Sequence, residues 1–128
     1  MKVLLDTCTL IWATLSPSEL SLAARDAIAD EGNVVLVSAA SAWEIATKVR
    51  AGKLPGAEAL ERNYLDVMED AGYTLLDIDA ESALRAGRIV AEHRDPFDRM
   101  IAAQALGLDI PVVSPDSLMD QFGVRRVW

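Results

Sequence analysis

Short apolar runs alternate with longer amphipathic segments along the whole chain. Each run predicts a strand; the five are residues 3–5, 34–37, 73–76, 111–114 and, as a last edge strand, 124–127. Between them apolar residues recur at helical spacing, as in residues 57–71. Strands that alternate with helices indicate an α/β fold, in which a parallel sheet is flanked by helices on both faces.

The helices expected between these strands are bounded by capping residues and by glycine or proline stops. Their expected ranges are residues 8–15, 22–30, 38–52, 57–71, 79–91 and 95–106. In the fifth helix, Val90 is expected on the apolar face together with Leu84. In the sixth, Asp95 is the expected N-cap, Pro96 the first helical residue and Gly107 the stop.

Length and composition narrow the class of protein. The chain has 128 residues, of which 52% are hydrophobic, so we expect one domain over residues 1–128 with a substantial core. No apolar stretch is long enough to span a bilayer, and Asp6 interrupts the N-terminus before a signal-like segment can form. The single cysteine, Cys8, excludes an internal disulfide framework and suits a reducing compartment, so we expect a cytoplasmic protein.

Four acidic residues follow the ends of expected strands or lie in the helices after them: Asp6, Glu44, Asp98 and Asp116. Parallel strands bring their carboxyl ends to one edge of the sheet, where ligands bind in open α/β sheets. Carboxylates gathered there repel one another unless some protonate or a cation lies among them. Oxygen ligands favour Mg²⁺ or Mn²⁺ over Zn²⁺, and such a metal suits phosphodiester hydrolysis.

Each acid also has a purely structural interpretation. Asp6 and Asp116 could cap the segments that follow them, and Asp98 falls at the third position of its helix, where an acid favours the helix dipole. Glu44 could form a surface ion pair with Lys48, worth only ~0.3–0.5 kcal/mol. The recurrence of all four at the same edge favours a shared site.

Other polar side chains near these acids have less specific roles. The hydroxyls of Thr7 and Ser38 could bond a carboxylate or cap a helix. His93, the only histidine, is expected at a helix C-terminus or in support of a ligand rather than as a ligand itself. Cys8 is expected in the core. Arg99 could clamp a phosphate or pair with a nearby acid.

The net charge of −8 argues at first against a nucleic-acid partner. Metal would offset part of it, however, and basic residues bunch near the acids. Lys48, Arg50 and Lys53 follow Glu44, and Arg94 and Arg99 flank Asp98. A basic rim around an acidic centre is compatible with a phosphodiester substrate, and the acidity could equally attract a basic protein.

Five segments taken together carry a family resemblance: residues 4–7, residues 38–44 with Lys48, residues 52–54, residues 95–105 and residues 113–116. In their order and spacing they resemble the PIN domain and, more narrowly, the VapC-like toxins of bacterial type II toxin–antitoxin modules. The resemblance implies a PIN-like three-layer sandwich and a Mg²⁺- or Mn²⁺-dependent ribonuclease acting on RNA. It implies that Asp6, Glu44 and Asp98 are the core catalytic metal ligands, with Asp116 as the fourth acid. It also implies a homodimer and a small antitoxin whose tail covers the active site.

Three other classes of protein are alternatives to the nuclease. A phosphoaspartyl receiver would have two adjacent acids after its first strand and a late lysine, but Thr7 follows Asp6 and no lysine follows Lys53. A haloacid-dehalogenase-type phosphatase would have an acid where Cys8 stands. A non-catalytic acidic module for a basic partner would be favoured by one degraded ligand position, but all four are acidic. We therefore favour the nuclease.

Overall fold

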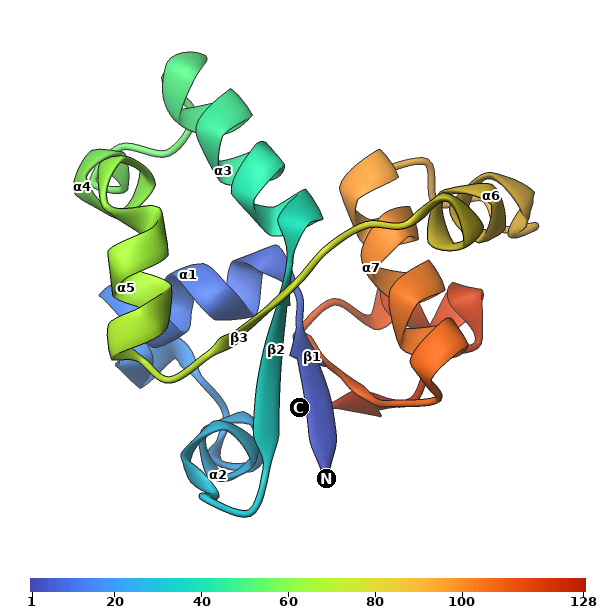
Figure 1. Cartoon of the computed structure of the whole chain (residues 1–128), viewed down its shortest axis with the longest axis horizontal. Coiled ribbons are helices and arrows are strands. Elements are labelled where there is room, and N and C mark those ends of the chain that lie inside the picture. The colour runs from blue at the N-terminus through green and yellow to red at the C-terminus, as the bar shows by residue number, and fades with distance from the viewer.

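A five-stranded, entirely parallel sheet runs through the centre of the molecule, with strand order β3-β2-β1-β4-β5 (Figure 1). The computed structural model describes residues 1–128. The strands are β1 Lys2–Leu5, β2 Val34–Ser38, β3 Thr74–Leu76, β4 Val112–Val113 and β5 Arg126–Val127. The central strand β1 pairs in parallel with β2 and with β4, so its carboxyl end lies beside the carboxyl ends of those two strands. The predicted α/β fold is confirmed.

Seven α-helices and two short 3-10 helices connect the strands. They are α1 Thr7–Leu15, η1 Pro17–Glu19, α2 Leu22–Ala29, α3 Ala39–Arg50, α4 Glu58–Arg62, α5 Tyr64–Asp70, α6 Ala80–Arg88, α7 Pro96–Leu108 and η2 Ser117–Phe122. In Figure 1 the sheet is seen on edge, with α1, α2, α4 and α5 on one side and α6 and α7 on the other. No helix has both the length and the apolar character needed to cross a bilayer.

The alternation of side chains along the strands builds two separate cores. In β1, Val3 and Leu5 face a cluster with α1, α2, α4 and α5, whereas Leu4 between them packs with α7 and η2. All three are fully buried. Successive strand side chains point to opposite faces, so a strand covered on both faces is apolar at every position. This explains why the strands read as continuous apolar runs.

Two helices differ from their expected extents. The helix expected over residues 57–71 is divided at Asn63, whose side chain donates to the Ala59 carbonyl at 3.0 Å, although Leu60 and Met68 remain buried. The expected helix over residues 79–91 ends at Arg88, and Val90 is 98% exposed rather than buried in the core. Leu84 on the same helix is also exposed.

Gly107 does not end its helix as expected. Helix α7 continues to Leu108, and Asp109 takes the left-handed position after it, with φ 54°. A Cβ atom at position 107 would lie 2.5 Å from Nη1 of Arg85 on α6. The glycine therefore leaves room for the end of the Arg85 side chain rather than making a turn.

Candidate metal centre

Asp6 is held in place at the carboxyl end of the central strand. It is the N-cap of α1: its Oδ1 accepts from the Thr9 backbone N–H at 2.8 Å, and its Oδ2 accepts from the Ser114 hydroxyl at 2.5 Å. Only 3% of the residue is exposed. Burial raises the pKa of Asp6 above its usual value, although both hydrogen bonds oppose the shift. The capping interpretation is correct, and the carboxylate is nonetheless one of the most deeply buried acids.

Glu44 lies on α3, in the second turn after β2, and is only 6% exposed. Its Oε2 pairs with Lys48 four residues on. Its Oε1 is buried and has no hydrogen-bond partner. A buried carboxylate oxygen without a partner is costly, so the ion pair with Lys48 does not complete the environment of this group.

Asp98 stands in the first turn of α7 and faces His93. His93 Nε2 and Asp98 Oδ2 are 2.8 Å apart. Burial, reinforced by the charges of Asp95, Asp6 and Glu44, raises the pKa of Asp98 to about 6. The N-cap of α7 is Asp95, whose Oδ1 accepts from the backbone N–H groups of Phe97 and Asp98 at 2.9 and 3.2 Å. The two neighbouring acids therefore have separate roles, as predicted: one caps the helix and the other faces the centre.

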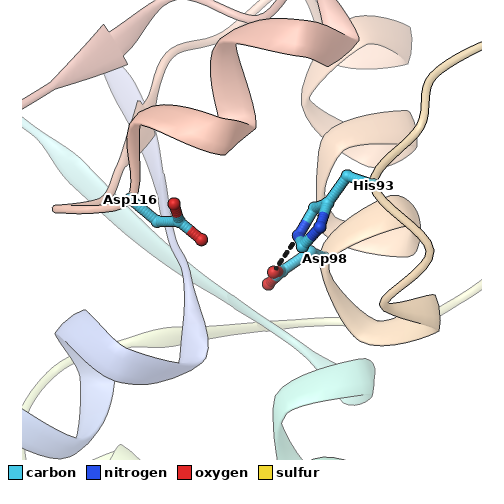
Figure 2. A group of neighbouring side chains, drawn as sticks. All are labelled: His93, Asp98 and Asp116. Atoms are coloured by element: carbon cyan, nitrogen blue, oxygen red, sulfur yellow. Dashed lines mark hydrogen bonds and ion pairs between the residues drawn. The ribbon is translucent and has the colours of Figure 1, made fainter.

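Asp116 follows β4 and completes a compact group with His93 and Asp98. Ligand atoms of these three residues lie within 4.8 Å of one another. Figure 2 shows the Asp116 carboxylate and the His93–Asp98 pair facing the same space from two different segments. Asp116 also caps η2, accepting from the Leu118 N–H at 2.9 Å.

The two acids on the other side, Asp6 and Glu44, are outside that compact group, but the four carboxylates share one electrostatic field. The pKa of the Cys8 thiol is raised by the charges of all four. Burial first, and then the charges of Asp6, Glu44, Asp116 and Asp98, raise its pKa to about 11. A raised pKa favours the thiol form of Cys8 over the nucleophilic thiolate; the residue is half-buried rather than in the core as expected.

Of the two hydroxyls expected near the acids, Ser38 takes the capping role: its oxygen accepts from the Ala40 N–H at 3.0 Å at the start of α3, and its hydroxyl donates to Gln104 Oε1 at 2.5 Å. Thr7 pairs with the Ser41 hydroxyl at 2.9 Å, so neither residue contacts a carboxylate. The hydroxyl that does is that of Ser114, which no local pattern in the sequence indicates.

Arg99 neither pairs with an acid nor faces the centre with free donors. Its guanidinium donates to the backbone carbonyls of Ala86 and His93, at 3.1 and 3.2 Å, and to that of Ile89. These bonds cover the C-terminal end of α6 and fix the segment that carries His93. The His93 backbone N–H also donates to Gln121 Oε1 at 3.3 Å, and its ring lies 5.5 Å from the Phe122 ring. His93 contacts Asp98 and could itself offer a ligand atom, so its expected supporting role stays a prediction.

The chain matches the sequence model of one known domain family. The model of the PIN domain matches residues 3–124, almost the whole chain. The chain belongs to the PIN domain family. The match includes all four acids and every strand except the last.

Known proteins similar to this PIN domain point the same way. Ribonuclease VapC16 of Mycobacterium tuberculosis is 44% identical over 55 residues, which cover 43% of this chain and 39% of that protein. The matched region is thus well under half of the relative's length.

Solved structures share the fold at low sequence identity. VapBC2 from Rickettsia felis, bound to a DNA fragment from its promoter, has a TM-score of 0.72 at 15% identity, covering 98% of this chain and 97% of the other. FitAcB from Neisseria gonorrhoeae has a TM-score of 0.61 at 19% identity over 97% and 95%. VapBC-1 from nontypeable Haemophilus influenzae has a TM-score of 0.62 at 16% identity over 98% and 96%. At these identities they show that the PIN fold is shared.

The donor set of this PIN domain fits a hard divalent cation. Its acids supply carboxylate oxygens, which such cations prefer, and one of these oxygens is buried without a partner. The raised pKa values of Asp6 and Asp98 show that burial and mutual repulsion disfavour their charged forms in the metal-free protein. A cation among them would reverse that balance.

Two cavities flank the acids without being the acid centre itself. The first, of about 250 Å³, lies between α1 and α3 and is lined by Thr7, Cys8, Ile11, Trp12, Glu44, Lys48 and Leu54. We call it the α1–α3 cavity. The second, of about 210 Å³, is mainly apolar and is lined by Ala40, Trp43, Ile78, Ala86, Gly87, Pro96, Phe97, Arg99 and Met100. We call it the α3–α7 groove.

Proposed function

We propose that this PIN domain, over residues 1–128, is a cytoplasmic, divalent-metal-dependent endoribonuclease that hydrolyses RNA phosphodiester bonds. We further propose that it is the toxin of a type II toxin–antitoxin pair. The observation that carries the proposal is the buried, unpartnered Oε1 of Glu44 within a field shared by four carboxylates. The sequence identity of 44% with Ribonuclease VapC16 over 55 residues supports RNA as the substrate.

In this proposal Asp6, Glu44 and Asp98 are the catalytic metal ligands and Asp116 is the fourth acid. Mg²⁺ or Mn²⁺ suits such oxygen ligands. When bound, the ion would supply charge stabilisation at the phosphoryl oxygens and activation of water, so no protein nucleophile is required. The thiol character of Cys8 agrees with that division of work.

The residues of the chain itself position the ligands and hold the RNA. The Ser114 hydroxyl and the Thr9 N–H orient Asp6, and His93 orients Asp98. Such supporting hydrogen bonds fix the geometry of metal ligands. Arg50, Lys53 and Arg94 are exposed cations near these ligands in the sequence, and they supply positive charge for the RNA backbone.

An antitoxin would restrain the enzyme through two adjoining features. Its arginine fork would bond carboxylate oxygens in the acid cluster and so compete with metal. A charge pair roughly breaks even after desolvation, so apolar contact must supply most of the affinity. The α3–α7 groove offers it: Trp43 is 61% exposed and meets Phe97 edge-on at 4.9 Å between ring centroids, one residue from Glu44 and Asp98 respectively. The homodimer expected from the resemblance remains a prediction, which the mass in solution would test.

The experiment for the enzyme is cleavage of a defined RNA by purified protein with Mg²⁺ or Mn²⁺ and with a chelator. We expect endonucleolytic products that need metal and are absent with Asp98→Asn prepared identically. Metal-independent products, or equal products from the variant, would indicate a contaminating nuclease and contradict the proposal.

The experiment for the toxin role is growth after induction. Expression of this chain alone should slow growth, and co-expression of the neighbouring gene's product should restore it. Normal growth with folded, metal-binding protein would exclude the toxin role while leaving an RNA-processing nuclease.

A further inference from the structure

The α1–α3 cavity adjoins the acid centre and has no part in the roles assigned so far. Glu44 belongs to both the cavity wall and the acid centre, and Thr7, also in the wall, directly follows Asp6. Figure 1 shows α1 and α3 starting at the same end of the neighbouring strands β1 and β2, which is the end where Asp6 follows β1. A group bound in this cavity would therefore lie next to a phosphate held at the acid centre.

The geometry points to a specific occupant: the unpaired nucleobase that flanks the scissile phosphate. This inference rests on the proposed ribonuclease function and deepens it by naming Trp12 as the base-binding residue beside the scissile phosphate.

The lining of the cavity matches the chemistry of a base. One wall is apolar and aromatic, built from Ile11 and Trp12 of α1 and from Leu54 in the loop after α3. Every base has a π-face that stacks on such a surface, and stacking on aromatic side chains is the usual means of holding single-stranded nucleic acid. The Trp12 ring also packs with that of Trp128, with the two ring centroids 5.8 Å apart.

The opposite wall is polar and carries the charge that the backbone needs. Lys48 lines it and is partly exposed, so its ammonium can turn toward a phosphate once a cation takes over Glu44. The α3–α7 groove, by contrast, lacks a free cation in its lining, because all three guanidinium nitrogens of Arg99 bond backbone carbonyls. Of the two cavities, the α1–α3 cavity is thus the one suited to a nucleotide.

A double-mutant cycle between protein and substrate tests this directly. The substrates are a short single-stranded RNA with one cleaved bond and versions that are abasic on either side of that bond. The protein variants are Trp12→Leu, which keeps apolar volume but removes the aromatic face, and Trp12→Phe, which keeps an aromatic ring. Leu22→Ala, at an exposed leucine on α2, is the matched control for loss of surface apolar area.

We expect wild type to lose about 5- to 150-fold in kcat/KM on one of the two abasic substrates, the range typical for one stacked base. Trp12→Leu should lose a similar factor on intact RNA, mainly through KM, and nothing further on that abasic substrate. Trp12→Phe should retain most of the wild-type value, and Leu22→Ala all of it.

If the cavity received something else, such as a side chain of a protein partner, the effects of Trp12→Leu and of the abasic substrate would be independent. The two factors in kcat/KM would then multiply, and that result would overturn the base assignment. Absence of any RNA cleavage by wild type would overturn the ribonuclease function itself, which keeps the two failures distinct. If Trp12→Leu lowers the melting temperature too far to assay, Leu54→Ala at the cavity wall runs the same cycle with the same two decisive outcomes.

Discussion

The acid centre has two halves that are built in different ways. One half, Asp6 and Glu44, is at most 6% exposed and comes from the segments that directly follow the paired strands β1 and β2; we call it the strand-borne half. The other half, His93, Asp98 and Asp116, is only partly buried and lies in or next to the loops after α6 and β4; we call it the loop-borne half. In the first half, one carboxylate is fixed by a hydroxyl and a backbone N–H. In the second, an acid and a histidine hold each other (Figure 2).

This difference indicates that the two halves have different roles in binding a cation. Buried hydrogen bonds make the strand-borne half a fixed platform, at the cost of a buried Glu44 oxygen that lacks a partner. The loop-borne half has less burial and can adjust as the ion enters. Of its residues, His93 and Asp116 should therefore tune affinity, whereas Asp98, as a proposed direct ligand, should be as indispensable as Asp6 and Glu44.

The largest expected effect comes from removing ligands. Asp6→Asn, Glu44→Gln and Asp98→Asn should each lower RNA cleavage by more than about 100-fold, because loss of a group that merely supports a ligand already costs about 10- to 100-fold. Asp116→Asn should cost less, since an asparagine oxygen can still cap η2. Steady-state kinetics at saturating Mn²⁺ measure this order. Full activity of Asp6→Asn with loss only in Asp116→Asn would invert the assignment of the two halves.

An intermediate effect is expected from the histidine that orients Asp98. His93→Ala should weaken Mn²⁺ binding by about 10- to 100-fold, because it frees Asp98 to rotate. His93→Gln, which can still donate a hydrogen bond, should recover part of that loss. Calorimetric titration of the metal separates this from damage to the fold, which the melting temperature reports. Unchanged affinity in His93→Ala would mean that the pair is incidental.

The loop-borne half should also respond to pH. The pKa of Asp98 rises on folding, to about 6, so the protonated form stabilises the folded state and that contribution is lost as pH rises through about 6. Metal-free protein should thus lose on the order of 2 kcal/mol of unfolding free energy between pH 4 and pH 7 through this group. Asp98→Asn should flatten the profile and raise metal-free stability at pH 7.

Metal binding should show the opposite trend with pH. A cation must displace the Asp98 proton below pH 6, so its affinity should fall by up to about tenfold per pH unit there. Titrations at pH 5 and pH 7 measure this change. An affinity that does not vary between them would show that Asp98 is not a ligand.

The smallest effect is expected just outside the centre, at the cap of α7. Asp95→Ala should cost about 1 kcal/mol of stability and leave cleavage largely intact. Asp79→Ala removes the equivalent cap of α6, where Asp79 accepts from the Ser82 N–H at 2.7 Å, and is the matched control. Denaturant unfolding gives both values. If folded Asp95→Ala were inactive while Asp98→Asn remained active, the roles of these two acids would be exchanged.

Local chemistry explains which features the sequence predicts well. Strand positions follow from apolar runs covered on both faces, and the expected cap at Asp95 lies within three residues of the N–H groups it accepts from. Parallel topology also predicts that acids following β1, β2 and β4 lie toward one edge of the sheet. These inferences need no knowledge of distant contacts.

The missed features all depend on partners far apart in the chain. Ser114 orients Asp6 across 108 positions, and Gln104 meets Ser38 across 66. Helix α6 ends earlier than expected, and at its end Arg99, ten or more residues on, donates hydrogen bonds to the Ala86 and Ile89 carbonyls. Apolar periodicity continues through Val90 and carries no sign of that interaction.

The most direct test of the central claim is anomalous diffraction from a crystal of the protein grown with Mn²⁺. The claim is that the two halves close around a common cation. We predict an anomalous peak within ligand distance of Asp6, Glu44 and Asp98, with the Glu44 oxygen that lacks a protein partner directed at the ion. No peak at saturating Mn²⁺, or a peak bound only by the loop-borne residues, would contradict the account.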